Sequence, residues 1–192
     1  MIKIGITGSL ASGKTTASKI LSANKGPLFV ADREVKKLYK KKSFKNLLSK
    51  KFNIDEKKNI KSSLKKIITK DISNLTKLEQ IIHPLVRKEM RKFIKKYKNK
   101  KLLFFEIPLL IESNLMKNFD IIFLIKANKK TRIKRFVAKG GNPKFFETLN
   151  KKQLDHKTKA QFCDYIVVNE KKLKIFKIKL LDIFKRYERS IS

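Results

Sequence analysis

Apolar residues follow two periods along this chain, one typical of buried strands and one typical of helices. Short apolar runs of strand length occupy residues 1–6, 27–31, 102–106, 120–125 and 165–168. Between them, apolar residues recur every three or four positions, which predicts helices over 15–21, within 33–70, and over 74–97, 128–139, 145–162 and from about 171 onward. Strands that alternate with helices predict an α/β fold, with a five-stranded parallel sheet flanked by helices.

The chain between the second and third predicted strands has helices but no strand. Residues 53–58 form a polar break there, and His83-Pro84 is expected to interrupt the helix over 74–97, because proline disfavours helical geometry in the residue before it. This stretch is too long for a plain crossover between parallel strands. We therefore expect a single domain in which a helical subdomain, about 33–100, stands beside a core formed by about 1–32, 101–138 and 163–192.

The first apolar run leads directly into a glycine-rich loop. The loop reads Gly8-Ser9-Leu10-Ala11-Ser12-Gly13-Lys14-Thr15, the G-x-x-x-x-G-K-T pattern of a phosphate-binding P-loop. A strand, a glycine loop and a helix in this order aim several backbone N–H groups and a helix N-terminus at one anion. Lys14 can then reach the β- and γ-phosphates, and the Thr15 hydroxyl can bind Mg²⁺. The motif predicts a nucleoside triphosphate site that contains Gly8, Ala11, Ser12, Gly13, Lys14, Thr15 and Thr16.

Charged side chains stand near the carboxyl ends of other predicted strands, the edge at which open parallel sheets bind ligands. Asp32 follows the second strand and could orient the attacking hydroxyl of an acceptor, or cap the next helix. Glu106 ends the third strand and could support Mg²⁺, or be a plain strand-end carboxylate. Arg135 lies one turn after Arg132 and shortly before Gly140-Gly141, which suits a lid that closes over phosphates.

The two histidines show no local catalytic pattern. His83 lies in an apolar segment, which is more typical of a packed or capping side chain than of a base. His156 has no local motif and is expected at the surface.

Composition and charge indicate the partners and setting of the chain. Its 192 residues include 50 Lys and Arg against 16 Asp and Glu, a formal charge of +34. The lysines are scattered rather than gathered in one arm, so we expect a solvated surface that attracts small polyanions and no dedicated nucleic-acid partner. No apolar stretch approaches membrane-spanning length, and the amino terminus leaves no room for a signal peptide, so no membrane partner is expected. The lone Cys163 fits a cytoplasmic protein.

Several further motifs follow the P-loop in a fixed order. They are Val30-Ala31-Asp32, Ile82-His83-Pro84-Leu85-Val86, Ile107-Pro108-Leu109-Leu110-Ile111-Glu112, Arg135, Gln153 with Lys159, and Asp164-Tyr165-Ile166-Val167-Val168-Asn169. In this order they resemble the dephospho-CoA kinase family over nearly the whole chain. The resemblance implies a nucleotide-kinase-like P-loop fold with a helical CoA-side subdomain and a short lid at about 139–162. It also implies phosphorylation of the ribose 3′-hydroxyl of dephospho-CoA by ATP with Mg²⁺, the last step of coenzyme A synthesis.

The resemblance also implies roles for single residues. Asp32 would act as the base-like residue at the acceptor hydroxyl, Lys14 and Thr15 would hold the triphosphate and Mg²⁺, and Arg135 would precede the lid. The acceptor side would include His83, Pro108, Leu109 and Glu112.

Two departures from the family pattern concern the acceptor. Lys36 stands where the family usually has arginine, and a lysine keeps the charge but loses the bidentate fork. Val30 stands where the family often has a second acidic residue. Both departures put the details of acceptor binding in doubt and leave the triphosphate site unchanged.

Three other functions remain as alternatives from the sequence. A different small P-loop kinase, acting on a nucleoside, nucleotide or shikimate-like acceptor, would share the triphosphate site. A GTPase would need an Asn-Lys-x-Asp motif, but Asn128-Lys129-Lys130-Thr131 lacks the aspartate. A nucleic-acid-binding protein would retain polynucleotide binding after loss of Lys14, with a steep salt dependence.

Overall fold

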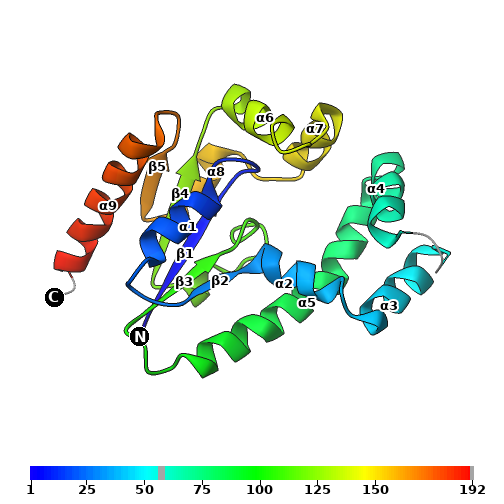
Figure 1. Ribbon diagram of the computed structural model, residues 1–192, viewed down its shortest axis with the longest axis horizontal. Coiled ribbons are helices and arrows are strands. Elements are labelled where there is room, and N and C mark those ends of the chain that lie inside the picture. Colours follow the sequence, from blue (N-terminus) through cyan, green and yellow to red (C-terminus); the bar gives the residue numbers. More distant parts are fainter. Residues whose placement is uncertain (56–58, 191–192) are drawn as a thin grey trace. The chain divides into compact units, whose positions relative to one another are not determined.

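The computed structural model describes residues 1–55 and 59–190 (Figure 1). These residues divide into two compact units. The first unit contains residues 1–30 and the chain from 94 onward, and the second contains residues 31–93. Part of the predicted polar break, residues 56–58, lies outside the described residues.

The first unit is built on a parallel sheet whose strands lie in the order β2-β3-β1-β4-β5. Within residues 1–55 and 59–190 the strands are β1 (Ile2–Gly8), β2 (Leu28–Val30), β3 (Leu102–Glu106), β4 (Ile121–Lys126) and β5 (Tyr165–Val168). Ile6 and Val30 both pair with Glu106, so the carboxyl ends of the first three strands are in register. The five-stranded parallel sheet that the sequence predicts is therefore confirmed.

Two helices cover one face of this sheet and bury its core. They are α1 (Lys14–Ser22) and α9 (Leu173–Ser190), and Figure 1 shows them beside the strands that they cover. Phe184 of α9 packs on Phe104 and Phe123, with ring centroids 5.9 and 6.2 Å apart. On the opposite face, Gly5 is approached by Leu110 and Phe119. The sheet is thus covered on both sides, as its nearly continuous apolar strands require.

Three short helices follow β4 in the chain and precede β5. They are α6 (Lys129–Val137), α7 (Pro143–Lys151) and α8 (His156–Ala160), each preceded by an Asn or Asp whose side chain accepts hydrogen bonds from the first turn. The sequence predicts one helix over 145–162, and this prediction is wrong. Asp155 accepts from the N–H groups of Lys157 and Thr158 at 2.7 and 2.9 Å, so a new helix starts where the first has ended.

The second unit has helices and, within its described residues, no strand. These are α2 (Ala31–Leu38), α3 (Lys42–Phe52), α4 (Ile60–Lys70) and α5 (Ser73–Lys96), the last of which runs on into the first unit. Their buried core contains Leu38, Phe44, Leu48, Leu64, Ile68 and Leu78. Among the described residues, no helix is both long and apolar enough to cross a membrane.

The predicted interruption of a helix at His83-Pro84 is wrong. Helix α5 continues through Pro84. Proline removes one N–H from the helix ladder. The residues on either side, Ile81, Ile82, Leu85 and Val86, pack against the core of the second unit, and we attribute the continuity of the helix to this packing.

Candidate active site

The P-loop connects β1 to α1 in a conformation that requires its glycines. Gly8 and Gly13 have φ angles of 148° and 103°, which favour glycine over any other residue. A Cβ at Gly8 would meet the carbonyl oxygen of Ile125, and a Cβ at Gly13 would meet the Asn169 side-chain nitrogen. Ala11 also has a positive φ, 59°. Ile125 therefore packs against the loop at Gly8, and Asn169 packs against it at Gly13.

Lys14 bends back over the loop that precedes it. Its Nζ donates to the carbonyl oxygen of Ser9 at 2.9 Å, and the residue is only 8% exposed. The ammonium is therefore kept within the loop that the glycines shape.

Glu106 reaches from the end of β3 to the first turn of α1. Its Oε1 accepts from the Thr15 hydroxyl at 2.6 Å and its Oε2 accepts from the Ser18 hydroxyl at 2.8 Å, and the residue is 2% exposed. The structure thus brings together the two residues that the sequence assigns to a metal, and adds Ser18. A hydroxyl and a carboxylate are hard oxygen ligands of the kind that Mg²⁺ prefers. The described residues contain no group of three or more His, Cys, Asp and Glu side chains that could hold a metal ion.

Arg135 of α6 and Asn169, which directly follows β5, meet at the Ser12 carbonyl of the P-loop. Asn169 Nδ2 donates to this carbonyl at 2.9 Å, and Arg135 donates to it at 3.3 Å and to Asn169 Oδ1 at 3.4 Å. Arg135 thus contacts the P-loop directly. Asn169 belongs to a motif quoted above for the resemblance, but the sequence assigned it no role.

Arg132, one turn earlier on α6, serves a different purpose. It is 5% exposed, donates to Asn150 Oδ1 at 2.7 Å and lies over the Phe146 ring at 5.5 Å. Burial lowers the pKa of its guanidinium. Arg132 therefore ties α7 to α6, while Arg135 faces the P-loop.

The connection between α7 and α8 and the first residue of α8 also contact the P-loop. Gln153 Oε1 accepts from the Leu10 N–H at 2.8 Å, and His156 Nδ1 lies 3.4 Å from the Ser9 hydroxyl. The expectation that His156 lies at the surface is wrong, because it is half-buried and its Nε2 is fully enclosed. Burial, and next the positive charge of Arg132, lower the pKa of His156. No local pattern could have revealed this contact, which spans 147 positions of the chain.

The residues after β3 are tied to the same segment. Glu112 Oε1 lies 2.7 Å from the Nζ of the fully buried Lys159 and accepts from the Leu154 N–H at 3.2 Å. The Pro108 carbonyl accepts from the Thr7 hydroxyl at 3.1 Å, and Leu109 is half-buried. The Glu112 Oε2 is buried and has no hydrogen-bond partner among the described residues, so this carboxylate keeps one oxygen available for a further donor.

Asp32 and His83 belong to the second unit. Asp32 is an exposed residue in the first turn of α2, which begins at Ala31 directly after β2. A carboxylate at this place interacts favourably with the helix dipole. His83 is half-buried within α5, where burial and then the charge of Arg87 lower its pKa. The predicted site residues therefore fall into a set gathered around the P-loop and a second set on α2 and α5.

Comparisons with known proteins give one consistent result. A family model described as dephospho-CoA kinase (CoaE) matches residues 2–174. The dephospho-CoA kinase of Fusobacterium nucleatum is 32% identical over 196 residues, which cover 97% of this chain and 95% of that protein. The dephospho-CoA kinase of Bartonella quintana is 34% identical over 175 residues, which cover 88% and 90%. A crystal structure of TT1252 from Thermus thermophilus matches with a TM-score of 0.78 and 23% identity, and covers 96% of this chain and 97% of that one.

Proposed function

Because the chain belongs to the dephospho-CoA kinase family, we propose that it transfers the γ-phosphoryl group of ATP to the ribose 3′-hydroxyl of dephospho-CoA. This reaction gives coenzyme A and completes its synthesis. The observation that carries the proposal is the match of the family model to residues 2–174. A P-loop with positive φ angles at its glycines, and with Lys14 and Thr15 at its end, supports it.

The P-loop would hold the triphosphate. Backbone N–H groups of the loop and of the first turn of α1 would bind the phosphate oxygens, with Gly8, Ala11, Ser12, Gly13, Lys14, Thr15 and Thr16 as the binding residues. Lys14 would neutralise charge that develops during transfer, and Arg135, which reaches the Ser12 carbonyl at 3.3 Å, would add a second cation.

Thr15 and Glu106 would hold Mg²⁺. Their oxygens meet at 2.6 Å and fit the preference of this ion, and phosphate oxygens and waters would complete its shell. When bound, Mg²⁺ neutralises the charge of the transferred phosphoryl group. Ser18 would keep the Glu106 carboxylate in place through its 2.8 Å hydrogen bond.

Asp32 would orient the acceptor hydroxyl and accept its proton. Its position in the chain, two residues after β2 ends, supports this role, because open parallel sheets bind ligands beyond the carboxyl ends of their strands. His83, Pro108, Leu109 and Glu112 would contact the acceptor. Residues from about 33 to 100 would form the acceptor subdomain, and residues from about 139 to 162 would form the lid, with Gly140, whose φ is 79°, in the connection to α7.

A cytoplasmic location is part of the proposal. With a single cysteine, Cys163, the chain has no intrachain disulfide that a reducing compartment could break.

The proposal is tested by ATP consumption with different acceptors. Purified protein with Mg²⁺ is given dephospho-CoA, adenosine, AMP or shikimate, and ADP formation is followed. We expect turnover with dephospho-CoA that depends on Lys14 and is far above that with the other acceptors. Turnover that is highest with a nucleoside, AMP or shikimate would assign the chain to a different small kinase, and equal ADP formation without any acceptor would make it an ATPase.

A further inference from the structure

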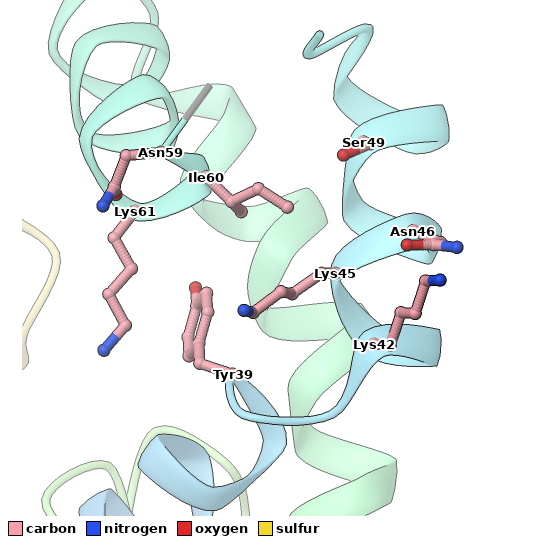
Figure 2. A pocket seen from close by; sticks show the side chains of 8 residues that line it. All are labelled: Tyr39, Lys42, Lys45, Asn46, Ser49, Asn59, Ile60 and Lys61. Carbon is pink, nitrogen blue, oxygen red and sulfur yellow. The ribbon is translucent and has the colours of Figure 1, made fainter. Parts of the chain in front are cut away.

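A cavity of about 480 Å³ lies within the second unit, and none of the residues assigned above is among its lining residues (Figure 2). It opens between α3 and the start of α4, and its volume is in the range of small-molecule pockets. Its lining residues are Tyr39, Lys42, Lys45, Asn46, Ser49, Asn59, Ile60 and Lys61. Seven of the eight, all but Ile60, carry a polar or charged group that a ligand could contact.

One face of α3 supplies half of this lining. Lys42, Lys45, Asn46 and Ser49 follow the i, i+3, i+4, i+7 spacing of a single helix face. The other face of the helix packs Phe44 and Leu48 into the core of the unit. Figure 2 shows Lys45 extending toward Tyr39 and Ser49 pointing toward Ile60 of α4, while Lys42 and Asn46 turn outward at the rim.

The described lining of the pocket carries three lysines and no carboxylate. Across residues 1–55 and 59–190, none of Lys42, Lys45 and Lys61 forms an ion pair with a carboxylate. The ammonium groups of Lys45 and Lys61 repel each other on either side of Tyr39, and an anion beside them would relieve this repulsion. The N-terminus of α4, which begins with Asn59, Ile60 and Lys61, adds the favourable end of a helix dipole to the same lining.

Ser49 gives an independent sign of a missing ligand. The residue is 4% exposed, and its hydroxyl is buried without a hydrogen-bond partner in the part of the chain that the structure describes. A buried hydroxyl without a partner costs free energy. A ligand oxygen in the pocket would provide the acceptor that the protein does not.

Tyr39 is held rigidly at the other side of the pocket. Its ring makes an edge contact with Phe44, with centroids 5.4 Å apart, and Lys61 Nζ lies over the ring at 5.0 Å. The phenol is therefore a fixed hydrogen-bond donor beside two ammonium groups.

We propose that this pocket is a binding site for a phosphate-bearing small molecule, recognised through Lys45, Lys61, Tyr39 and the Ser49 hydroxyl. Two sources of such a group are compatible with this chemistry. One is the diphosphate of the acceptor, dephospho-CoA, and this source rests on the proposed function. The other is a separate phosphorylated metabolite that binds beside the reaction.

The first experiment uses inorganic pyrophosphate as the probe, without metal ions, in titration calorimetry. Wild type is compared with Lys45→Ala, with Lys14→Ala to remove the P-loop site, and with Lys50→Ala, which changes the same charge on α3 outside the pocket. We expect binding that persists in Lys14→Ala and Lys50→Ala and weakens about tenfold or more in Lys45→Ala. Amide NMR shifts on titration should cluster at Tyr39, Ser49 and Lys61.

A second variant separates binding from folding. Ser49→Ala removes an unpaired hydroxyl, so the melting temperature should stay the same or rise, while pyrophosphate affinity falls about three- to tenfold. Equal affinity in Lys45→Ala and Lys50→Ala, or NMR shifts spread over the whole basic surface, would overturn the proposal in favour of non-specific charge attraction.

Kinetics then distinguish the two sources. If the ligand is the acceptor diphosphate, Lys45→Ala raises KM for dephospho-CoA about tenfold and leaves KM for ATP unchanged, whereas Lys50→Ala changes neither. If the ligand is a separate metabolite, both KM values stay unchanged although pyrophosphate binding is lost. A failure of the proposed reaction would appear as no turnover with dephospho-CoA and would leave the pyrophosphate result intact.

Discussion

Asn169 connects the end of the sheet to the P-loop, and its removal is the sharpest test of how the loop is held. Its Nδ2 donates to the Ser12 carbonyl at 2.9 Å, its Oδ1 accepts from Arg135 at 3.4 Å, and its side chain fills the space beside Gly13. The residue is 7% exposed. In Asn169→Ala the Ser12 carbonyl keeps only the longer bond from Arg135, and Arg135 loses one of its two contacts at the loop.

The structure sets the size of the effect. Leaving a buried polar group without its partner costs about 1–3 kcal/mol, and the remaining Arg135 bond at 3.3 Å places the loss in the lower part of that range, about 1–2 kcal/mol. For chains of about 150–250 residues, each kcal/mol lowers the melting temperature by about 2–4 °C. We expect a drop of about 2–8 °C. Losing the hydrogen bond that holds the loop also weakens MgATP binding. Each 1.4 kcal/mol of this loss lowers the affinity about tenfold.

The assay combines thermal unfolding by circular dichroism with calorimetric titration of MgATP. Asn99→Ala is the control, because Asn99 is exposed in the turn before β3 and its loss should change stability by no more than about 0.5 kcal/mol. If Asn169→Ala melts within about 1 °C of the control and binds MgATP as wild type does, Asn169 does not hold the P-loop.

Four further changes have defined outcomes. Lys14→Ala should lower turnover roughly 10²–10³-fold, since it removes one preorganised cation, and turnover within tenfold of wild type would take Lys14 out of the mechanism. Asp32→Asn should lower turnover while MgATP affinity stays nearly intact; an equal loss of both would make Asp32 structural or metal-binding. Burial lowers the pKa of both His83 and His156 below the ordinary 6.5, so the unfolded chain binds more protons than the folded one in acid. The free energy of unfolding, measured with urea, should therefore fall as the pH is lowered from about 7 to about 5. His156→Gln should make this fall shallower, and an unchanged slope would mean that His156 is not buried in solution. The charge of +34 should make the melting temperature rise from about 0.02 M to about 0.3 M salt, and a flat or falling curve would contradict self-repulsion as a limit on stability.

The strands and the P-loop were predictable because their signals are local. The P-loop is recognised from consecutive residues alone, because an apolar run of strand length leads directly into its glycines, lysine and threonine. The strands β3 and β5 have the predicted bounds. The two errors in helices arise where packing or a cap outweighs propensity. Helix α5 continues through Pro84 because the neighbouring residues pack into the core of the second unit. Asp155 caps a new helix at a point where the apolar period of the sequence continues.

The side chains that hold the P-loop could be seen only in the structure. Gln153, His156 and Asn169 lie roughly 140–160 positions from the loop that they contact. Nothing in their surroundings marks a glutamine or an asparagine as a partner of a backbone N–H or carbonyl. Such contacts depend on the strand order β1-β4-β5 and on the turn between α7 and α8, which sequence periodicity does not specify.

The same distinction explains why the pocket of the second unit was not predicted, whereas the P-loop was. The triphosphate site is built from consecutive residues, whereas the face of α3 with Lys42, Lys45 and Ser49 has the spacing of an ordinary solvated helix face in a very basic chain. The resemblance also relates the departure at Lys36, in the second unit, to the acceptor. Substitutions in the second unit should therefore change acceptor kinetics and leave KM for ATP unchanged. If Lys36→Arg, which restores the family residue, lowers KM for dephospho-CoA without changing KM for ATP, the two substrates are recognised by separate units; an equal change in both KM values would contradict that division.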